Sequence, residues 1–145
     1  MLSDVFLARL EKLYADYLKT VQDLEDNRKL GEGMFGFKGG PADNPCHDRF
    51  AADLSALLEE FERQEPDSAE TRAVMEYIYE APSRFPRPRT ASWMLLAVHG
   101  LTAPLIDRLS GEDAQALYTA YTGRYRRWER LPNQIELLKK LKAKC

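Results

Sequence analysis

One short segment of the chain contains a cysteine, a histidine and aspartates, all of which are residue types that can carry out chemistry. Cys46 is the second residue of a helix if Asn44 caps that helix, and a helix N-terminus favours the thiolate form of cysteine. A thiolate acts as a nucleophile when a base lies within reach, and the two histidines of the chain are His47 and His99. Because adjacent helical residues do not face each other, a Cys46–His99 pair depends on the fold.

The same segment could supply ligands to a metal ion. Asp43, Cys46, His47 and Asp48 are clustered, and His99 could add a further ligand. Their spacing matches neither the C-x-x-C nor the H-E-x-x-H pattern of zinc sites. The alternatives are ordinary ones: a buried thiol, helix capping at the start of the segment, and a hydrogen-bonded histidine in the core. We therefore treat Asp43, Cys46, His47 and His99 as a candidate pocket and assign no cofactor to it.

Glycine is concentrated just before these residues. Five of the eight glycines fall there, namely Gly31, Gly33, Gly36, Gly39 and Gly40. The first three fit the G-x-G-x-x-G spacing, and the run GEGMFG resembles the glycine-rich loop of a protein kinase. A kinase loop lies between two strands, and a strand lysine and two catalytic aspartate motifs follow it. The chain lacks those motifs, and the residues before Gly31 are typical of a helix. The sequence therefore favours a long connecting loop from Gly31 to His47.

A second candidate site is basic. Cations alternate with aromatic rings from Arg124 to Arg130, and three more arginines follow Pro82. Surfaces of this kind bind nucleic acids, with guanidinium groups on phosphates and rings on bases. The pI of about 5.8 argues against nonspecific nucleic-acid binding. The candidate basic surface consists of Arg84, Arg87, Arg89, Arg126, Arg127 and Arg130.

Composition and charge limit the possible classes of protein. A chain of 145 residues with 44% hydrophobic and 30% charged residues is typical of one globular domain, so we predict a single domain over residues 1–145. The longest apolar run, Trp93 to Val98, is too short to span a membrane. Two cysteines make no disulfide framework, and charged residues interrupt any N-terminal leader, so we expect a cytoplasmic protein.

The net charge of −2 is unevenly distributed. Residues 1–82 carry 9 Lys and Arg against 18 Asp and Glu, or −9, and residues 83–145 carry 12 against 5, or +7. This asymmetry predicts either an anionic partner for the basic half or attraction between the halves, within one chain or between two.

Periodicity predicts helices throughout. Apolar residues recur at helical spacing over residues 4–27, with Ser3 as N-cap, and again from Pro45 until Pro66. Further helices are expected from Asp67, over about 92–106, from Ser110 to about 130, and from Pro132, the last with Ile135, Leu138 and Leu141 facing inward. Residues 82–88 cannot form regular helix, and residues 84–89 should be extended and exposed. The segment 93–106 is apolar nearly all round, which predicts a buried central helix kinked at Pro104.

The expected fold is all-α, an irregular bundle of five or six helices around that central helix, with one long glycine-rich loop. The sequence assembles no complete catalytic set, so it favours action through protein–protein binding or self-association over enzymatic activity. The alternatives are a small-molecule or metal-binding pocket or enzyme that uses Cys46, His47 and His99, and polyanion binding through the basic half. We expect no membrane association.

Overall fold

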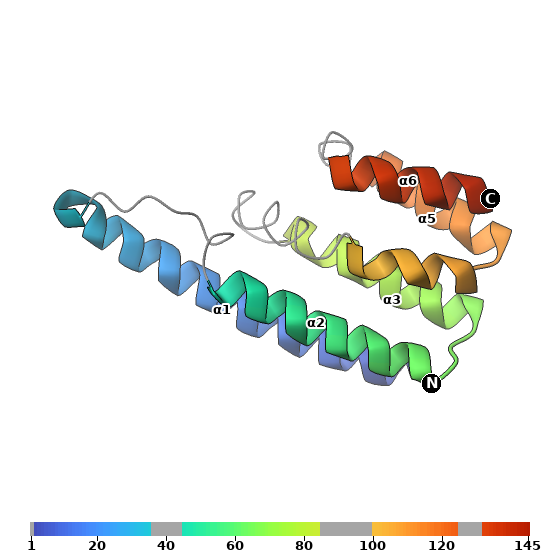
Figure 1. Ribbon diagram of the computed structural model, residues 1–145, viewed down its shortest axis with the longest axis horizontal. Helices are drawn as coiled ribbons and strands as arrows, with labels where there is room; N and C mark the ends of the chain where they lie inside the picture. The colour runs from blue at the N-terminus through green and yellow to red at the C-terminus, as the bar shows by residue number, and fades with distance from the viewer. Residues whose placement is uncertain (1, 36–44, 85–99, 125–131) are drawn as a thin grey trace.

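The structure, a computed structural model, describes residues 2–35, 45–84, 100–124 and 132–145, and these residues form helices and the turns between them (Figure 1). The α-helices are α1 (Leu2–Phe35), α2 (Pro45–Arg63), α3 (Ser68–Glu80), α5 (Gly111–Arg124) and α6 (Pro132–Lys144). Two 3-10 helices, η2 (Ala81–Arg84) and η3 (Ala103–Arg108), complete the described elements. The predicted all-α fold class is confirmed.

The helices form antiparallel pairs that are stacked side by side in two layers (Figure 1). One layer contains α1, α3 and α5, with α3 in contact with both neighbours. The other layer contains α2, the helical segment 100–108 and α6. Within the pairs, α1 contacts α2, α3 contacts η3, and α5 contacts α6. Both chain termini lie at one end of the stack. Stacked helical pairs of this kind are the building principle of α-solenoids.

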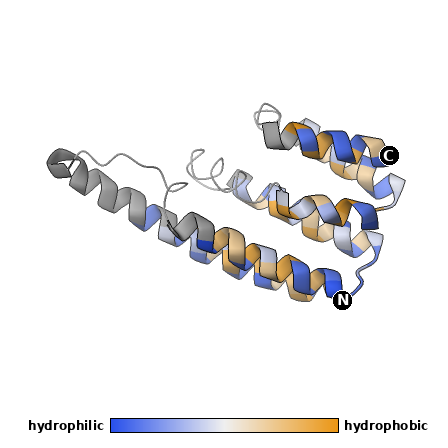
Figure 2. Cartoon of the chain, in the orientation of Figure 1, coloured by the Kyte–Doolittle hydropathy of each residue, from blue (hydrophilic) through white to orange (hydrophobic). Residues whose placement is uncertain are grey.

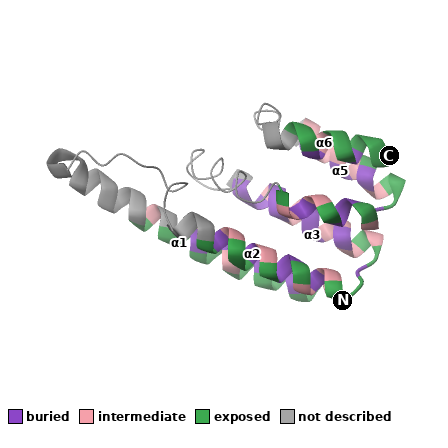
Figure 3. Ribbon diagram, in the orientation of Figure 1, coloured by how far each residue is buried: buried purple, intermediate pink, exposed green. Residues whose placement is uncertain are grey.

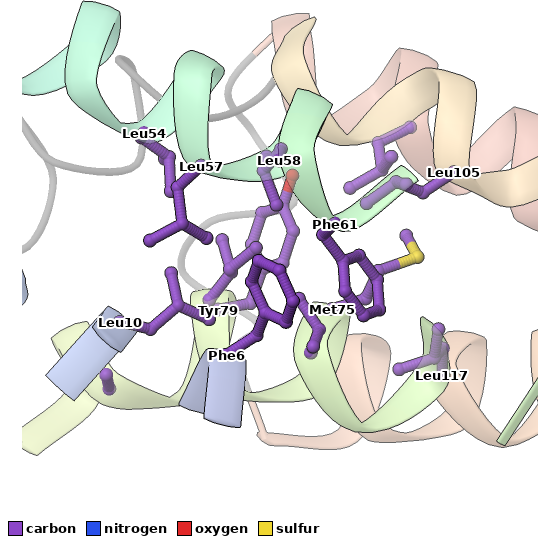
Figure 4. Packing of buried hydrophobic residues seen from close by; sticks show 14 of the residues in the cluster. Phe6, Leu10, Leu54, Leu57, Leu58, Phe61, Met75, Tyr79, Leu105 and Leu117 are labelled. Atoms are coloured by element: carbon purple, nitrogen blue, oxygen red, sulfur yellow. The ribbon is translucent and has the colours of Figure 1, made fainter. Parts of the chain in front are cut away.

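The hydrophobic core runs between the layers, where apolar faces meet (Figures 2 and 3). The stripe predicted on the first helix is buried at Phe6, Leu10 and Tyr17, and its neighbour Tyr14 is buried as well. Aromatic rings join α1 to α2, with Phe6 and Phe61 edge to face at 5.1 Å and Tyr17 stacked on Phe50 at 4.2 Å. The stripe of α2 is buried in full, at Phe50, Leu54, Leu57, Leu58 and Phe61. Figure 4 shows how Leu54, Leu57, Leu58 and Phe61 pack in the core.

Two predicted helix starts are confirmed by their hydrogen bonds. Asp67 accepts from the backbone N–H of Glu70 at 2.8 Å, and the Glu70 carboxylate accepts from the backbone N–H of Asp67 at 3.2 Å, which is a complete capping box. Ser110 Oγ accepts from the backbone N–H of Asp113 at 3.1 Å. The predicted N-cap Ser3 is wrong, because α1 begins at Leu2 and Ser3 is buried within it.

The glycine-rich segment differs from the prediction in its first part. The helix α1 continues through Gly31 and Gly33 to Phe35. Each glycine costs a helix about 1 kcal/mol relative to alanine, but strong helix formers lie around them, Lys29, Leu30, Glu32 and Met34 among them. The predicted loop therefore begins later than Gly31, and residues 36–44 lie outside the described part. The predicted start of the next helix at Pro45 is confirmed.

Three further differences have simple physical causes. Arg84 lies in a 3-10 turn rather than an extended segment, because the fixed φ of Pro82 also suits a 3-10 helix. Ile135 is 40% exposed, and Leu137 is buried in its place, since α6 turns its other face to α5 and η3. A kink was expected at Pro104. Close to this residue the helix instead changes type, because residue 102 is α-helical and the 3-10 helix η3 begins at Ala103.

The predicted central helix is described only from residue 100 onward. In that part Thr102, Leu105 and Ile106 are buried, whereas Gly100 and Pro104 are exposed. This stretch is therefore one member of the second layer, with one side in the core and one side facing solvent. The fifth helix is confirmed as far as Arg124, and its predicted extension to about residue 130 lies outside the described part.

Candidate functional site

The candidate pocket residues are only partly described. Cys46 and His47 lie in the first turn of α2, as the capping pattern predicted, but their side chains fall outside the described part of the chain. Asp43 and His99 lie outside it altogether. The Cys46–His99 pair therefore stays a prediction. Among the described residues, no group of three or more metal-ligating side chains comes together.

The candidate basic surface is described only at its first residue. Arg84 ends η2, whereas Arg87, Arg89, Arg126, Arg127 and Arg130 lie outside the described residues. The described helix ends that lead to these segments are on the side of the stack away from the chain termini (Figure 1). The start of α2, which carries Cys46 and His47, faces the same way. The described helix ends that adjoin the two candidate groups therefore lie at one end of the stack.

A polar cluster is fully described at the opposite end, where α3 and α5 begin. The Asp113 carboxylate accepts hydrogen bonds from the hydroxyl of Ser68, from Arg72 Nη1 at 3.1 Å and from Ser110 Oγ at 3.2 Å. The backbone N–H of Ser110 donates to Ser68 Oγ at 2.7 Å. These hydrogen bonds, led by that of Ser68, lower the pKa of Asp113. The cluster fastens two helix starts together, which is a structural role.

Two grooves flank the segment 100–108 in the second layer. The larger, of about 610 Å³, lies between this segment and α6, and its lining consists of Gly100, Ala103, Pro104, Ile106, Asp107, Lys140, Ala143 and Lys144. The smaller, of about 230 Å³, lies between the segment and α2, and its lining consists of Ser55, Leu58, Glu59, Glu62, Gly100, Leu101, Pro104 and Leu105. Both are mixed sites, with apolar side chains beside charged ones.

The two grooves differ in charge. Lys140 and Lys144 line the groove beside α6, whereas Glu59 and Glu62 line the groove beside α2. A third hollow, of about 410 Å³, adjoins the acidic groove and includes Arg63 and Arg108. Arg108 Nη2 donates to the backbone oxygen of Glu62 at 3.1 Å, so its charge is already engaged. The exposed side of segment 100–108 therefore separates an acidic groove from a basic one.

Neither groove follows from sequence patterns. Their walls come from residues about 40 positions apart, and helical periodicity says nothing about which helices become neighbours. The one available signal was the four lysines between Lys139 and Lys144, which by themselves suit the negative C-terminal pole of the last helix.

Within the described residues, no helix combines the length and the apolar character needed to cross a membrane. Comparison with protein families, with curated proteins and with solved structures finds no match for this chain.

Proposed function

We propose that this protein acts by binding polypeptide chains, either a partner protein or a second copy of itself, on the layer formed by α2, residues 100–108 and α6. The observation that carries the proposal is the pair of grooves on either side of residues 100–108, whose linings combine apolar and charged side chains. Specific protein interfaces combine an apolar centre with a polar rim in this way.

The architecture supports the same function. In a stack of helical pairs, each helix contacts only its neighbours, and one side of each layer faces solvent. Charged and apolar residues both reach that side, with Glu59, Pro104 and Lys140 exposed and Leu101 half-buried. A rigid layer of this kind presents side chains from several helices to one ligand. The low cysteine content of the chain supports a cytoplasmic location for this activity.

Site-specific photo-crosslinking in cells tests the proposal. A photoreactive residue replaces Glu59 or Lys140 in the grooved layer, and matched variants replace Glu11 or Gln115, which are exposed on the layer of α1, α3 and α5. The expected result is discrete adducts with protein from the grooved layer and not from the other one.

Light scattering of the purified protein over a range of concentrations then shows whether the occupant is a second copy. Adducts of equal yield from both layers, or from neither, would contradict the proposal.

A further inference from the structure

We infer that the groove between η3 and α6 binds an acidic peptide segment that also carries apolar side chains. The inference rests on the proposed function and specifies the chemistry of the partner.

The floor of the groove is suited to apolar side chains. Ala103, Pro104, Ile106 and Ala143 belong to the lining, and we call these four apolar residues its floor. Among the described residues, a Cβ atom added at Gly100 would meet nothing within 4 Å. A volume of about 610 Å³ is enough for several side chains of a bound peptide.

Charge selects the kind of peptide. Lys140 and Lys144 line the groove, and within the described residues neither forms an ion pair with a carboxylate. The Lys144 ammonium donates to the backbone oxygen of Asp107 at 3.4 Å, which holds that cation at the groove edge. Asp107 is the single acidic lining residue. Two lysines against one aspartate leave a positive potential that attracts carboxylates.

The surroundings of the groove favour a peptide over a nucleic acid. Glu59 and Glu62 line the groove on the other side of residues 100–105 and repel a long polyanion that would extend across the layer. A phosphate backbone also has no apolar groups to place on the floor formed by Ala103 and Ile106. A short segment in which acidic and apolar residues alternate matches both the lysine edge and the floor.

The experiment is a fluorescence-anisotropy titration of the whole chain with a labelled peptide of alternating glutamate and leucine. Lys140→Glu combined with Lys144→Glu is compared with Lys139→Glu combined with Lys142→Glu. Both pairs lie on α6, each includes one lysine of the last turn, and each changes the net charge equally. Only the first pair lines the groove. Circular dichroism checks that both variants keep the helical content of the parent.

We expect the first double variant to weaken binding by at least about tenfold, because two favourable exposed charge contacts become repulsive. The second double variant should stay within about threefold of the parent, since its charges act only over a longer, screened distance. A peptide with glutamine in place of glutamate should bind weakly to all three proteins.

Equal losses in both double variants would show attraction to the lysines of α6 in general and would overturn the inference. So would equal binding of the glutamine peptide, tighter binding of a single-stranded oligonucleotide of the same charge, or no binding of the glutamate–leucine peptide at low salt. Groove-specific crosslinks combined with any of these results would leave the proposed function standing and reject only this partner chemistry.

Discussion

The polar cluster around Asp113 offers a sharp test of how the stack is held together. The carboxylate joins the first turn of α5 to the start of α3, because Ser68 and Arg72 donate to it from a helix more than 40 residues away. The Asp113 side chain is 17% exposed, so most of its surface is shielded from water. Replacing Asp113 with alanine removes the acceptor of these bonds and keeps the N-cap hydroxyl of Ser110 in place.

The size of the effect follows from the partners. The hydrogen bond from the shielded Ser68 hydroxyl to a charged group contributes about 1.5 kcal/mol or more. The ion pair with Arg72 contributes about 0.2–1 kcal/mol, because the arginine side chain is 43% exposed. With the weaker bond from Ser110, Asp113→Ala should lower the free energy of unfolding by about 2–3 kcal/mol. For a chain of this size that corresponds to a fall in Tm of about 6–10 °C.

The assay is urea unfolding monitored by circular dichroism, repeated across a pH series. Glu112→Ala is the matched control, because Glu112 also lies in the first turn of α5 and is exposed. This control substitution should lower the free energy of unfolding by at most about 0.5 kcal/mol, which is the contribution of an exposed charge near a helix N-terminus. The pKa of Asp113 in the folded chain is lower than its value of about 3.9 in the unfolded chain. The carboxylate therefore stabilises the fold fully above about pH 3.9, and this contribution is lost as the pH falls through the pKa of the folded state.

The difference between the parent and Asp113→Ala should therefore be greatest at neutral pH and shrink below about pH 4. A difference that stays constant down to about pH 2.5 would refute the role of the carboxylate charge. Equal losses in Asp113→Ala and Glu112→Ala would show that only the helix dipole matters.

Three other substitutions probe the core and a turn by the same unfolding assay. Thr71→Val should raise the free energy of unfolding by about 1 kcal/mol, because the buried Thr71 hydroxyl has no hydrogen-bond partner in the described structure; a loss would reveal a hidden partner. Tyr14→Phe should lower it by about 1 kcal/mol, since the buried Tyr14 hydroxyl donates to the backbone oxygen of Ile78 at 3.0 Å, and an unchanged value would contradict that bond. Glu65→Gly should raise it by about 0.5–1 kcal/mol, because Glu65 has a φ of 53° after the last turn of α2, and destabilisation would mean that its side chain makes an unrecognised contact.

Local signals in the sequence predicted much of the fold, because helix starts and apolar stripes depend on neighbours within a few residues. Asp67, Ser110 and Pro45 mark helix starts as their chemistry requires. The predictions failed where tertiary contacts decide the outcome. Ile135 and Leu137 are both apolar and close in sequence, and only the position of α5 and η3 determines which one is buried.

Less of the candidate sites than of the fold could be predicted from the sequence. The placement of Cys46 in the first turn of α2 followed from Pro45 and the capping residues before it. The grooves depend instead on the packing of residues 100–108 against α2 on one side and α6 on the other. Which helices become neighbours depends on the order in which the pairs stack, and hydrophobic periodicity does not determine that order. The lysines of α6 were visible in the sequence, but their position beside an apolar floor was not.

The order in which the helical pairs stack also determines where the acidic and basic parts of the chain lie. Because each helical pair contacts mainly the next one, the order of elements along the chain is the order across the molecule. The acidic first half and the basic second half meet where α3 contacts α5 and η3. Within the described residues, the ion pair between Arg108 and Glu62 is the one that joins a base of the second half to an acid of the first. Lys140 and Lys144 form no ion pair among the described residues, so under the proposed function they are the cations that an acidic partner would contact.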